Sequence, residues 1–262
     1  MQHDFQFTRD TPSLVEAPEA LTPLQEKAAE LNARFKTAGA RTVLQASLNS
    51  ADLGRTALVS SFGADSVVLL HMASVIDKAL PVIFVNTEML FPETIVYQSE
   101  LTIKLGLWNV RIVRPDEHEV NARDPHGDLH LNSTSACCAL RKTRPLQKAL
   151  EGFDTWITGR KRFQSGTRAA LDFFEAEEAT GRIKVNPLAH WSVQDIANYM
   201  EANDLPKHPL IEKGYPSIGC EPCTSEVKAG EDARAGRWRG LNKSECGIHL
   251  DPKAALQEGA GA

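Results

Sequence analysis

The sequence predicts an α/β fold with a mostly parallel sheet that is covered by helices on both faces. Short apolar runs, typical of buried strands, alternate along the chain with longer segments of helical periodicity. This strand–helix alternation is typical of a doubly wound parallel sheet. The apolar share of 42% is sufficient for a sizeable core.

The predicted elements follow one another in a regular order. A first helix is predicted over residues 21–35, where apolar residues recur at three- and four-residue steps. Buried strands are predicted at residues 56–60, 81–85, 109–113, 155–158 and 183–185. Further helices are predicted at residues 66–79, 92–105 and 137–150, and from Ser192, which forms a capping-box-like start with Asp195. A long polar loop is expected between the third strand and residue 137.

The length of 262 residues fits one large domain with appendages. We expect an N-terminal helical segment at residues 1–52 and the α/β domain at residues 53–205. Residues 206–262 form a C-terminal segment in which glycine, proline and charged residues dominate. We expect this cysteine-bearing tail to fold back over the sheet and not to form a separate domain.

Composition excludes several classes of function. The net charge of −5 argues against a general nucleic-acid binder. No apolar run is long enough to span a bilayer, and the N-terminus lacks the basic and apolar regions of a signal peptide. We therefore expect a cytoplasmic protein that binds neither nucleic acid nor membrane. A homo-oligomer is compatible with the sequence.

The five cysteines carry the strongest signal. Cys137 and Cys138 are adjacent, Cys220 and Cys223 form a Cys-x-x-Cys pair, and Cys246 stands alone. Four thiolates are the right number for an iron–sulfur cluster or a zinc ion, and the fifth is free to act as a nucleophile. Structural disulfides are disfavoured in a reducing cytosol. Buried thiols without a common function are the other alternative.

Two further features indicate an anionic ligand. The loop at residues 60–66, SSFGADS, joins a predicted strand to a helix, where backbone amides and the helix dipole can hold a phosphate. Such a loop is also compatible with a simple turn. Two local clusters of cations could bind an anion or simply face solvent; they comprise Arg160, Lys161, Arg162 and Arg168, and Arg234, Arg237, Arg239 and Lys243.

Together these motifs resemble the adenylyl-sulfate reductase family of assimilatory sulfate reduction, within the adenine-nucleotide alpha-hydrolase-like fold. The resemblance extends over roughly residues 60–249. Its elements here are SSFGADS at residues 60–66, NTEMLFPET at 86–94, CCALRK at 137–142, TGRK at 158–161, IGCEPC at 218–223, GRW at 236–238 and ECGIH at 245–249. The cysteine motifs are specific, whereas the first loop is shared across the wider fold.

The first loop departs from the pattern of relatives that split ATP. Those relatives carry a Ser-Gly-Gly-x-Asp-Ser loop, but Phe62 occupies the first glycine position here and Ala64 follows Gly63. Two glycines let a backbone wrap closely around a pyrophosphate. The resemblance therefore implies that ATP is not the substrate.

The resemblance implies a thiol-based reduction of adenylyl sulfate to sulfite and AMP, which serves cysteine biosynthesis. Cys246 would attack sulfur to form an S-sulfonate, and thioredoxin or glutaredoxin would then release sulfite by thiol exchange. Lys142 and His249 are the other predicted catalytic residues, although His249 is equally compatible with a surface position. The predicted substrate-binding residues are Ser61, Gly63, Thr87, Arg160, Arg234 and Arg237.

The remaining thiols are the implied ligands of a 4Fe–4S cluster: Cys137, Cys138, Cys220 and Cys223. Two alternatives stay open. One is reduction of the 3′-phosphorylated substrate, although enzymes of that type generally lack these four cysteines. The other is a zinc-stabilised nucleotide-binding or sulfur-transfer module, which would give Cys246 no role.

Overall fold

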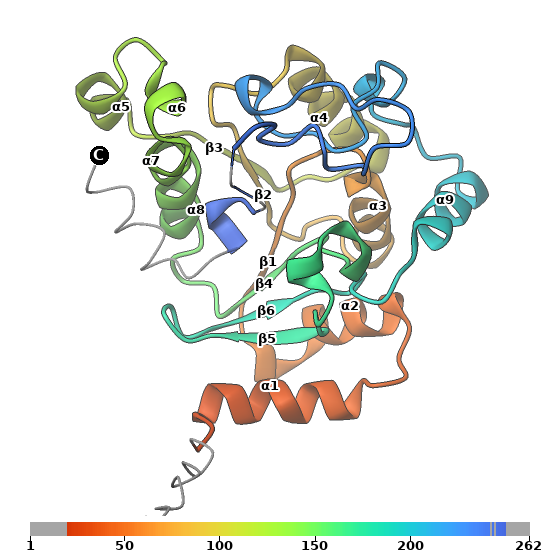
Figure 1. Cartoon of the computed structure of the whole chain (residues 1–262). Coiled ribbons are helices and arrows are strands. Elements are labelled where there is room, and N and C mark those ends of the chain that lie inside the picture. Colours follow the sequence, from red (N-terminus) through yellow and green to blue (C-terminus); the bar gives the residue numbers. More distant parts are fainter. Residues whose placement is uncertain (1–19, 242, 244, 250–262) are drawn as a thin grey trace, which may run out of the picture.

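The chain folds around one six-stranded sheet (Figure 1). The computed structural model describes residues 20–241, 243 and 245–249. The strands are β1 (Thr56–Val59), β2 (Val82–Val85), β3 (Val110–Val113), β4 (Thr155–Ile157), β5 (Phe174–Glu177) and β6 (Arg182–Val185). Their order is β3-β2-β1-β4-β6-β5, and every neighbouring pair is parallel except β5 with β6. The predicted mostly parallel sheet is thus confirmed.

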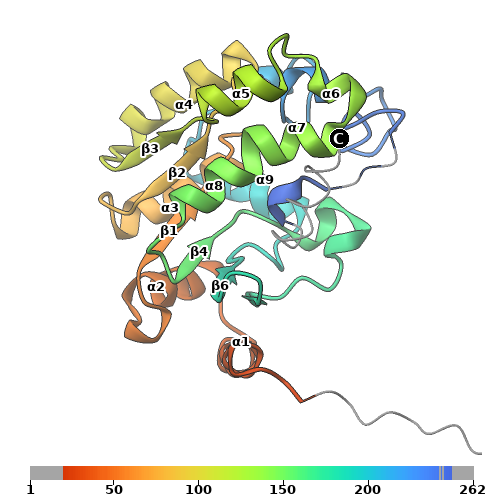
Figure 2. The ribbon, with the colours of Figure 1, turned by 90° about the vertical axis from the view of Figure 1, so that its left-hand side faces the viewer.

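Helices cover both faces of the sheet. One face packs against α1 (Pro23–Arg34), α2 (Ala40–Asn49), α3 (Ser66–Ile76), α4 (Pro92–Leu105) and α9 (Val193–Ala202). The other packs against α8 (Arg144–Ala149), which lies in front of the sheet in Figure 2. Apolar strand residues therefore point alternately into two cores, with Leu58 in the first and Ala57 and Trp156 in the second.

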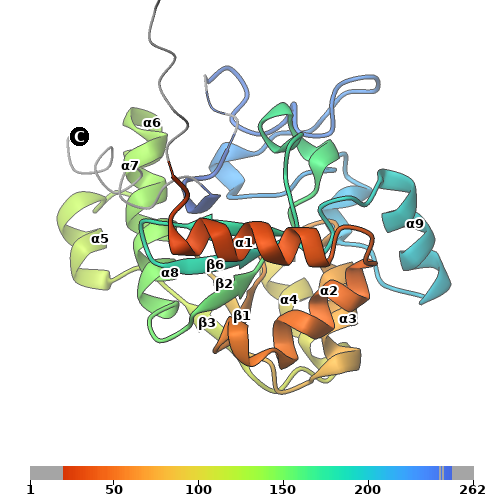
Figure 3. The same ribbon diagram turned by 90° about the horizontal axis from the view of Figure 1, so that it is seen from below.

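The N-terminal helices extend the larger core. Thr22 caps α1 in a capping box with Gln25, which fixes where the predicted first helix begins. Figure 3 shows α1 lying across β5 and β6 at the lower edge of the sheet. Asn32 of this helix exchanges hydrogen bonds with the backbone of Phe174, at 2.8 and 2.9 Å. This contact ties α1 to the antiparallel edge strand.

The region between β3 and β4 differs most from the expectation of a polar loop. It contains α5 (Glu117–Arg123) and α6 (Leu129–Asn132), followed by α7 (Thr134–Cys138) and a π-helical turn, η2 (Ala139–Thr143), that leads into α8. Asp116 and Ser133 cap α5 and α7 through their side-chain oxygens. The predicted helix at residues 137–150 therefore starts earlier and is wound irregularly. A π turn inserted in a helix is often found at functional sites.

Residues after α9 form short turns of helix: η5 (Pro209–Ile211), η6 (Glu221–Cys223) and η7 (Gly247–His249). Cys220 forms an antiparallel bridge with Leu90, and the Glu221 amide donates to the Met89 carbonyl at 2.8 Å. These bonds hold the Cys-x-x-Cys pair against the loop that follows β2. Within the described residues no helix is long and apolar enough to cross a membrane.

Candidate active site

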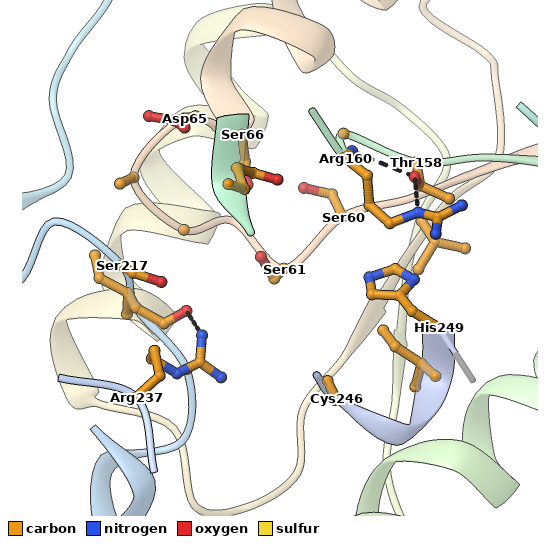
Figure 4. A pocket seen from close by; sticks show the side chains of 18 of the residues that line it. Ser60, Ser61, Asp65, Ser66, Thr158, Arg160, Ser217, Arg237, Cys246 and His249 are labelled. Carbon is orange, nitrogen blue, oxygen red and sulfur yellow. Dashed lines mark hydrogen bonds between the residues drawn. The ribbon is translucent and has the colours of Figure 1, made fainter. Parts of the chain in front are cut away.

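A cavity of about 210 Å³ opens at the carboxyl ends of β1 and β4. Its floor is the loop after β1, and η7 together with the segment around Arg237 forms its walls (Figure 4). Ligands of open parallel sheets bind at this edge. Of the predicted site residues, all but Thr87 and the four cluster cysteines line this cavity: Ser61, Gly63, Lys142, Arg160, Arg234, Arg237, Cys246 and His249.

The loop after β1 leads directly into the N-terminus of α3. Phe62 takes a left-handed conformation with φ of 49°, although it replaces a glycine of the ATP-splitting pattern. Its buried ring packs edge-on against Phe84, with the ring centroids 5.2 Å apart. Burial of the ring offsets the strain of about 1 kcal/mol or more that a non-glycine residue incurs there. The loop thus keeps a glycine-like backbone and gains a core contact.

Six cations line the cavity: Lys142, Arg160, Lys161, Arg168, Arg234 and Arg237. They differ in their partners. Arg160 pairs with Glu175 and donates to Asn186 at 3.2 Å. Arg237 donates to the Ile218 carbonyl at 3.3 Å and lies over the Trp238 ring, 4.4 Å from its centroid. In the described part of the chain, Lys142 has neither a hydrogen-bonding partner nor an ion pair. An ammonium group that no carboxylate neutralises in such a site is suited to meet an anionic substrate.

Lys142 is surrounded by thiols. Burial lowers the pKa of Lys142, but the nearby thiol groups of Cys246, Cys220 and Cys138 outweigh burial and raise this pKa above its usual range. The lysine therefore stays cationic. It lies four residues after Cys138, across the π-helical turn, as its spacing predicted for the cysteine-pair face.

Cys246 is buried at the start of η7. A hydrogen bond from Cys138 lowers the pKa of Cys246 well below the usual range of a thiol; Lys142 lowers it too, and together they outweigh the opposing effect of burial. The same hydrogen bond, with burial, raises the pKa of Cys138. Of the two thiols, Cys246 is therefore the one disposed to be a thiolate, the form that acts as a nucleophile.

His249 closes the same side of the cavity. Its ring stacks on Trp156 with the planes 3° apart and the centroids 6.2 Å apart. Burial and the charges of Arg160 and Arg168 hold the pKa of His249 well below its usual range, so the imidazole is neutral. Its buried Nδ1 has no hydrogen-bonding partner, nor do Trp156 Nε1 and Arg237 Nε. Buried polar atoms without a partner are uncommon in folded proteins, and these three belong to residues that line the cavity.

The four predicted cluster cysteines lie outside the cavity wall. Burial and the neighbouring Cys220 and Cys223 raise the pKa of Cys137 to about 12, so these three thiols lie near one another. The Cys138 thiol is directed to Cys246 instead. In the described residues, no three His, Cys, Asp or Glu side chains gather closely enough to hold a single metal ion. The zinc alternative gains no support from this arrangement, and the cluster stays a prediction.

Thr87 contacts the cysteines, and not the cavity where substrate binding was predicted. Its hydroxyl lies 3.2 Å from the Cys220 sulfur, and its carbonyl accepts a hydrogen bond from Arg141 at 3.3 Å. Arg141 is itself buried and paired with Asp124 at 2.8 Å. Thr87 therefore supports the Cys-x-x-Cys segment.

Sequence reasoning missed two pairs of residues at this site. Trp156 and Trp238 line the cavity, but Trp156 stands in an apolar strand without a motif, and Trp238 was noted only within GRW at residues 236–238, with no role. Arg168 and Glu245 form a buried ion pair across the cavity wall. Arg168 was visible only as one member of a basic cluster, and the position of Glu245 next to Cys246 was the only signal for it.

The fold and the cavity define an α/β protein with a nucleotide-type loop and a cation-lined cavity that holds a buried cysteine. A family model for the phosphoadenosine phosphosulfate reductase domain matches residues 55–226. The chain belongs to this family.

The similar proteins include two named adenosine 5'-phosphosulfate reductases. One, from Chelativorans sp. (strain BNC1), is 49% identical over 235 residues, which cover 89% of this chain and 95% of the relative. The other, from Mesorhizobium japonicum, is 50% identical over 86% of this chain and 87% of the relative.

Solved structures agree on the fold. A phosphoadenylyl-sulfate reductase from Candida auris, in a phosphate complex, superposes with a TM-score of 0.66 at 28% identity, covering 80% of this chain and 99% of that chain. Candida glabrata FMN adenylyltransferase, with FAD and pyrophosphate, gives a TM-score of 0.53 at 13% identity over 89% of this chain and 90% of that chain. The expected adenine-nucleotide alpha-hydrolase-like fold is therefore confirmed.

Proposed function

We propose that this protein reduces adenylyl sulfate to sulfite and AMP in assimilatory sulfate reduction, which supplies cysteine biosynthesis. One observation carries the proposal: the buried Cys246 thiol lies in a cavity that is also lined by Lys142, Arg160, Arg234 and Arg237. The two relatives at about 50% identity are named for the same activity. The reaction would take place in the cytoplasm, where the thiols stay reduced.

In the first step the Cys246 thiolate attacks the sulfur of the substrate. An S–S bond forms, the bond between sulfur and the bridging oxygen breaks, and AMP leaves with that electron pair. Both the substrate and the attacking group are anionic, so cations must offset their repulsion. Lys142 and Arg237 are placed on the Cys246 side of the cavity to do so, because both charges act on the Cys246 thiol.

The phosphate of the substrate would bind at the loop after β1. Ser61 and Gly63 supply a hydroxyl and backbone at the N-terminus of α3, where the helix dipole favours an anion. Arg160 and Arg234 would neutralise the rest of the phosphosulfate. The neutral His249 can donate one hydrogen bond to the sulfonate through Nδ1, in the tautomer that carries its proton on this nitrogen.

In the second step a thiolate of thioredoxin or glutaredoxin attacks the Cys246 sulfur. Sulfite leaves with the electron pair of the S–S bond, and a mixed disulfide forms. A second donor thiol then reduces this disulfide and returns Cys246 to its thiolate. The donor ends as a disulfide and supplies both electrons.

We propose a 4Fe–4S cluster on Cys137, Cys138, Cys220 and Cys223. The donor set fits: the four thiols come from two segments that meet near the cavity, and Lys142 and Lys243 supply positive charge beside them. Once bound, the cluster would supply negative charge and structural support near the sulfate.

The test is an anaerobic assay of sulfite release from adenylyl sulfate, with thioredoxin or glutaredoxin supplied. We expect sulfite and AMP in equal amounts, and the purified protein should be brown and contain iron. No sulfite with either donor, from protein that retains its iron, would overturn the proposal. Release only from the 3′-phosphorylated substrate would favour the alternative substrate.

A further inference from the structure

Glu245, the residue before Cys246, is bound tightly to the body of the protein. Its carboxylate accepts two parallel hydrogen bonds from Arg168, at 2.6 Å from Nε and 2.7 Å from Nη2. Both residues are buried, with 8% of Glu245 and 7% of Arg168 exposed. Paired, short, charge-assisted bonds of this kind fix both distance and orientation.

The rest of the Glu245 carboxylate is also satisfied. Ser165 and Thr167 donate hydroxyl hydrogen bonds to Oε1, at 3.1 and 3.3 Å. Arg234 lies 3.9 Å from Oε2. Apart from Arg234, these donors come from η4 (Gly166–Arg168) and from the residue between it and η3 (Arg162–Gln164), so one loop receives the carboxylate. A carboxylate with every oxygen occupied is costly to release and therefore determines where its neighbour lies.

Lys243, two residues before Glu245, makes weaker contacts. Lys243 lies 3.4 Å from the Ser135 hydroxyl and 3.7 Å from the Cys138 sulfur. Cys246 therefore follows a strong polar anchor at Glu245 and precedes η7, which is held by the stacking of His249 on Trp156. If the Glu245 anchor breaks, the polar tie between this segment and the η3–η4 loop is lost.

We propose that Glu245 is a positioning residue whose ion pair with Arg168 latches the Cys246 segment over the cavity. The latch is closed while Cys246 attacks the substrate and opens so that the thiol donor can reach the sulfonated cysteine. A reason for two states is geometric, since Cys246 is only 8% exposed when the latch is closed. The proposal rests on the proposed function for the role of Cys246.

The direct test is the rate at which iodoacetamide alkylates Cys246 in the iron-containing protein, followed by mass spectrometry of its peptide. In Glu245→Gln the carboxylate is lost with little change in shape. We expect alkylation at least about tenfold faster than in wild type, a change that corresponds to about 1.4 kcal/mol in the opening equilibrium. The matched control is Glu231→Gln, which breaks an exposed pair with Arg239 elsewhere in the tail and should leave the rate unchanged.

Glu245→Asp is the second variant, because it keeps the charge but cannot span the same distance to Arg168. We expect it to fold if Glu245→Gln does not, and to alkylate faster than wild type. An alkylation rate equal to that of wild type in either folded variant overturns the latch.

A second measurement separates positioning from general damage. Sulfonation of Cys246 by adenylyl sulfate without donor should slow at least about tenfold in Glu245→Gln, whereas sulfite release by donor from the sulfonated protein should not slow. Equal slowing of both steps would mean a merely structural role and overturn the proposal. If wild-type Cys246 takes up no sulfonate, the proposed function fails, while the alkylation rates still decide the latch.

Discussion

Replacing Lys142 with methionine removes one charge from the cavity and little else. The methionine chain is of similar length and can occupy the same partly buried space. In the described residues, no hydrogen bond or ion pair to Lys142 is lost. The substitution therefore tests the ammonium group itself.

The size of the effect follows from the charges that meet in the transition state. Two unit charges about 4 Å apart interact by about 4 kcal/mol at the effective dielectric constant of a protein surface site. Only the part that grows between the bound substrate and the transition state affects the chemical step. We therefore expect Lys142→Met to raise the activation free energy by about 2–4 kcal/mol. This rise corresponds to a loss of roughly 30- to 1,000-fold in kcat/KM.

The assay is sulfite release at saturating thiol donor, accompanied by iron content and thermal unfolding. We expect iron to be retained and Tm to change by only a few degrees, because no hydrogen bond is broken. Lys148→Met, on the exposed side of α8, is the matched control and should keep full activity. Activity of Lys142→Met within threefold of wild type, or a loss that parallels unfolding, would refute the electrostatic reasoning.

Three further predictions concern the cluster, the substrate and pH. Serine at any cluster position should remove iron and activity together, because a hydroxyl poorly replaces a soft thiolate; iron that survives all four changes would disprove the ligand set of Cys137, Cys138, Cys220 and Cys223. Adenylyl sulfate should exceed its 3′-phosphorylated relative by about a hundredfold or more in kcat/KM, since each predicted cation is assigned to the phosphosulfate; comparable values would overturn that assignment. His208 is buried and neutral, accepting from the Leu210 amide and lying 3.1 Å from the Thr94 hydroxyl, and burial lowers its pKa to about 4 from 6.5. Unfolding frees His208 to bind a proton, so its contribution to the free energy of unfolding is full above pH 6.5 and is lost as the pH falls toward 4. Denaturant titrations should show that the free energy of unfolding decreases by about 2 kcal/mol between pH 7 and pH 5. This decrease should be absent in His208→Gln.

Local patterns predicted the central strands of the sheet because burial on both faces restricts those strands to apolar residues. The runs at β1, β2 and β4 are apolar on both faces, as strands between two helical layers must be. The edge strand β5 escaped prediction because its sequence, FEAE, alternates acidic residues and lacks an apolar run. Helix α2 was predicted only as part of a helical segment over residues 1–52, without its bounds, since Ala40, Val43, Leu44 and Ser47 are a weak mark of its buried side.

The cavity could be predicted where a motif and a chemical role coincide, as for Cys246 and Lys142. Thr87 shows the limit of that reasoning. Thr87 follows β2, next to the loop after β1, yet its side chain contacts Cys220. The choice of side-chain rotamer that directs it there cannot be read from the sequence. The Arg168–Glu245 pair joins residues 77 positions apart, and only the folded chain brings them together.

The identity of the attacking thiol can be measured directly. The wild-type protein, incubated with adenylyl sulfate and no thiol donor, should release AMP and gain the mass of one SO₃ group on the peptide that contains Cys246. The Cys246→Ser variant should keep its iron and gain no such mass. A sulfonate found on any other cysteine, or sulfite released without any sulfonated protein, would contradict the assignment of Cys246 as the nucleophile.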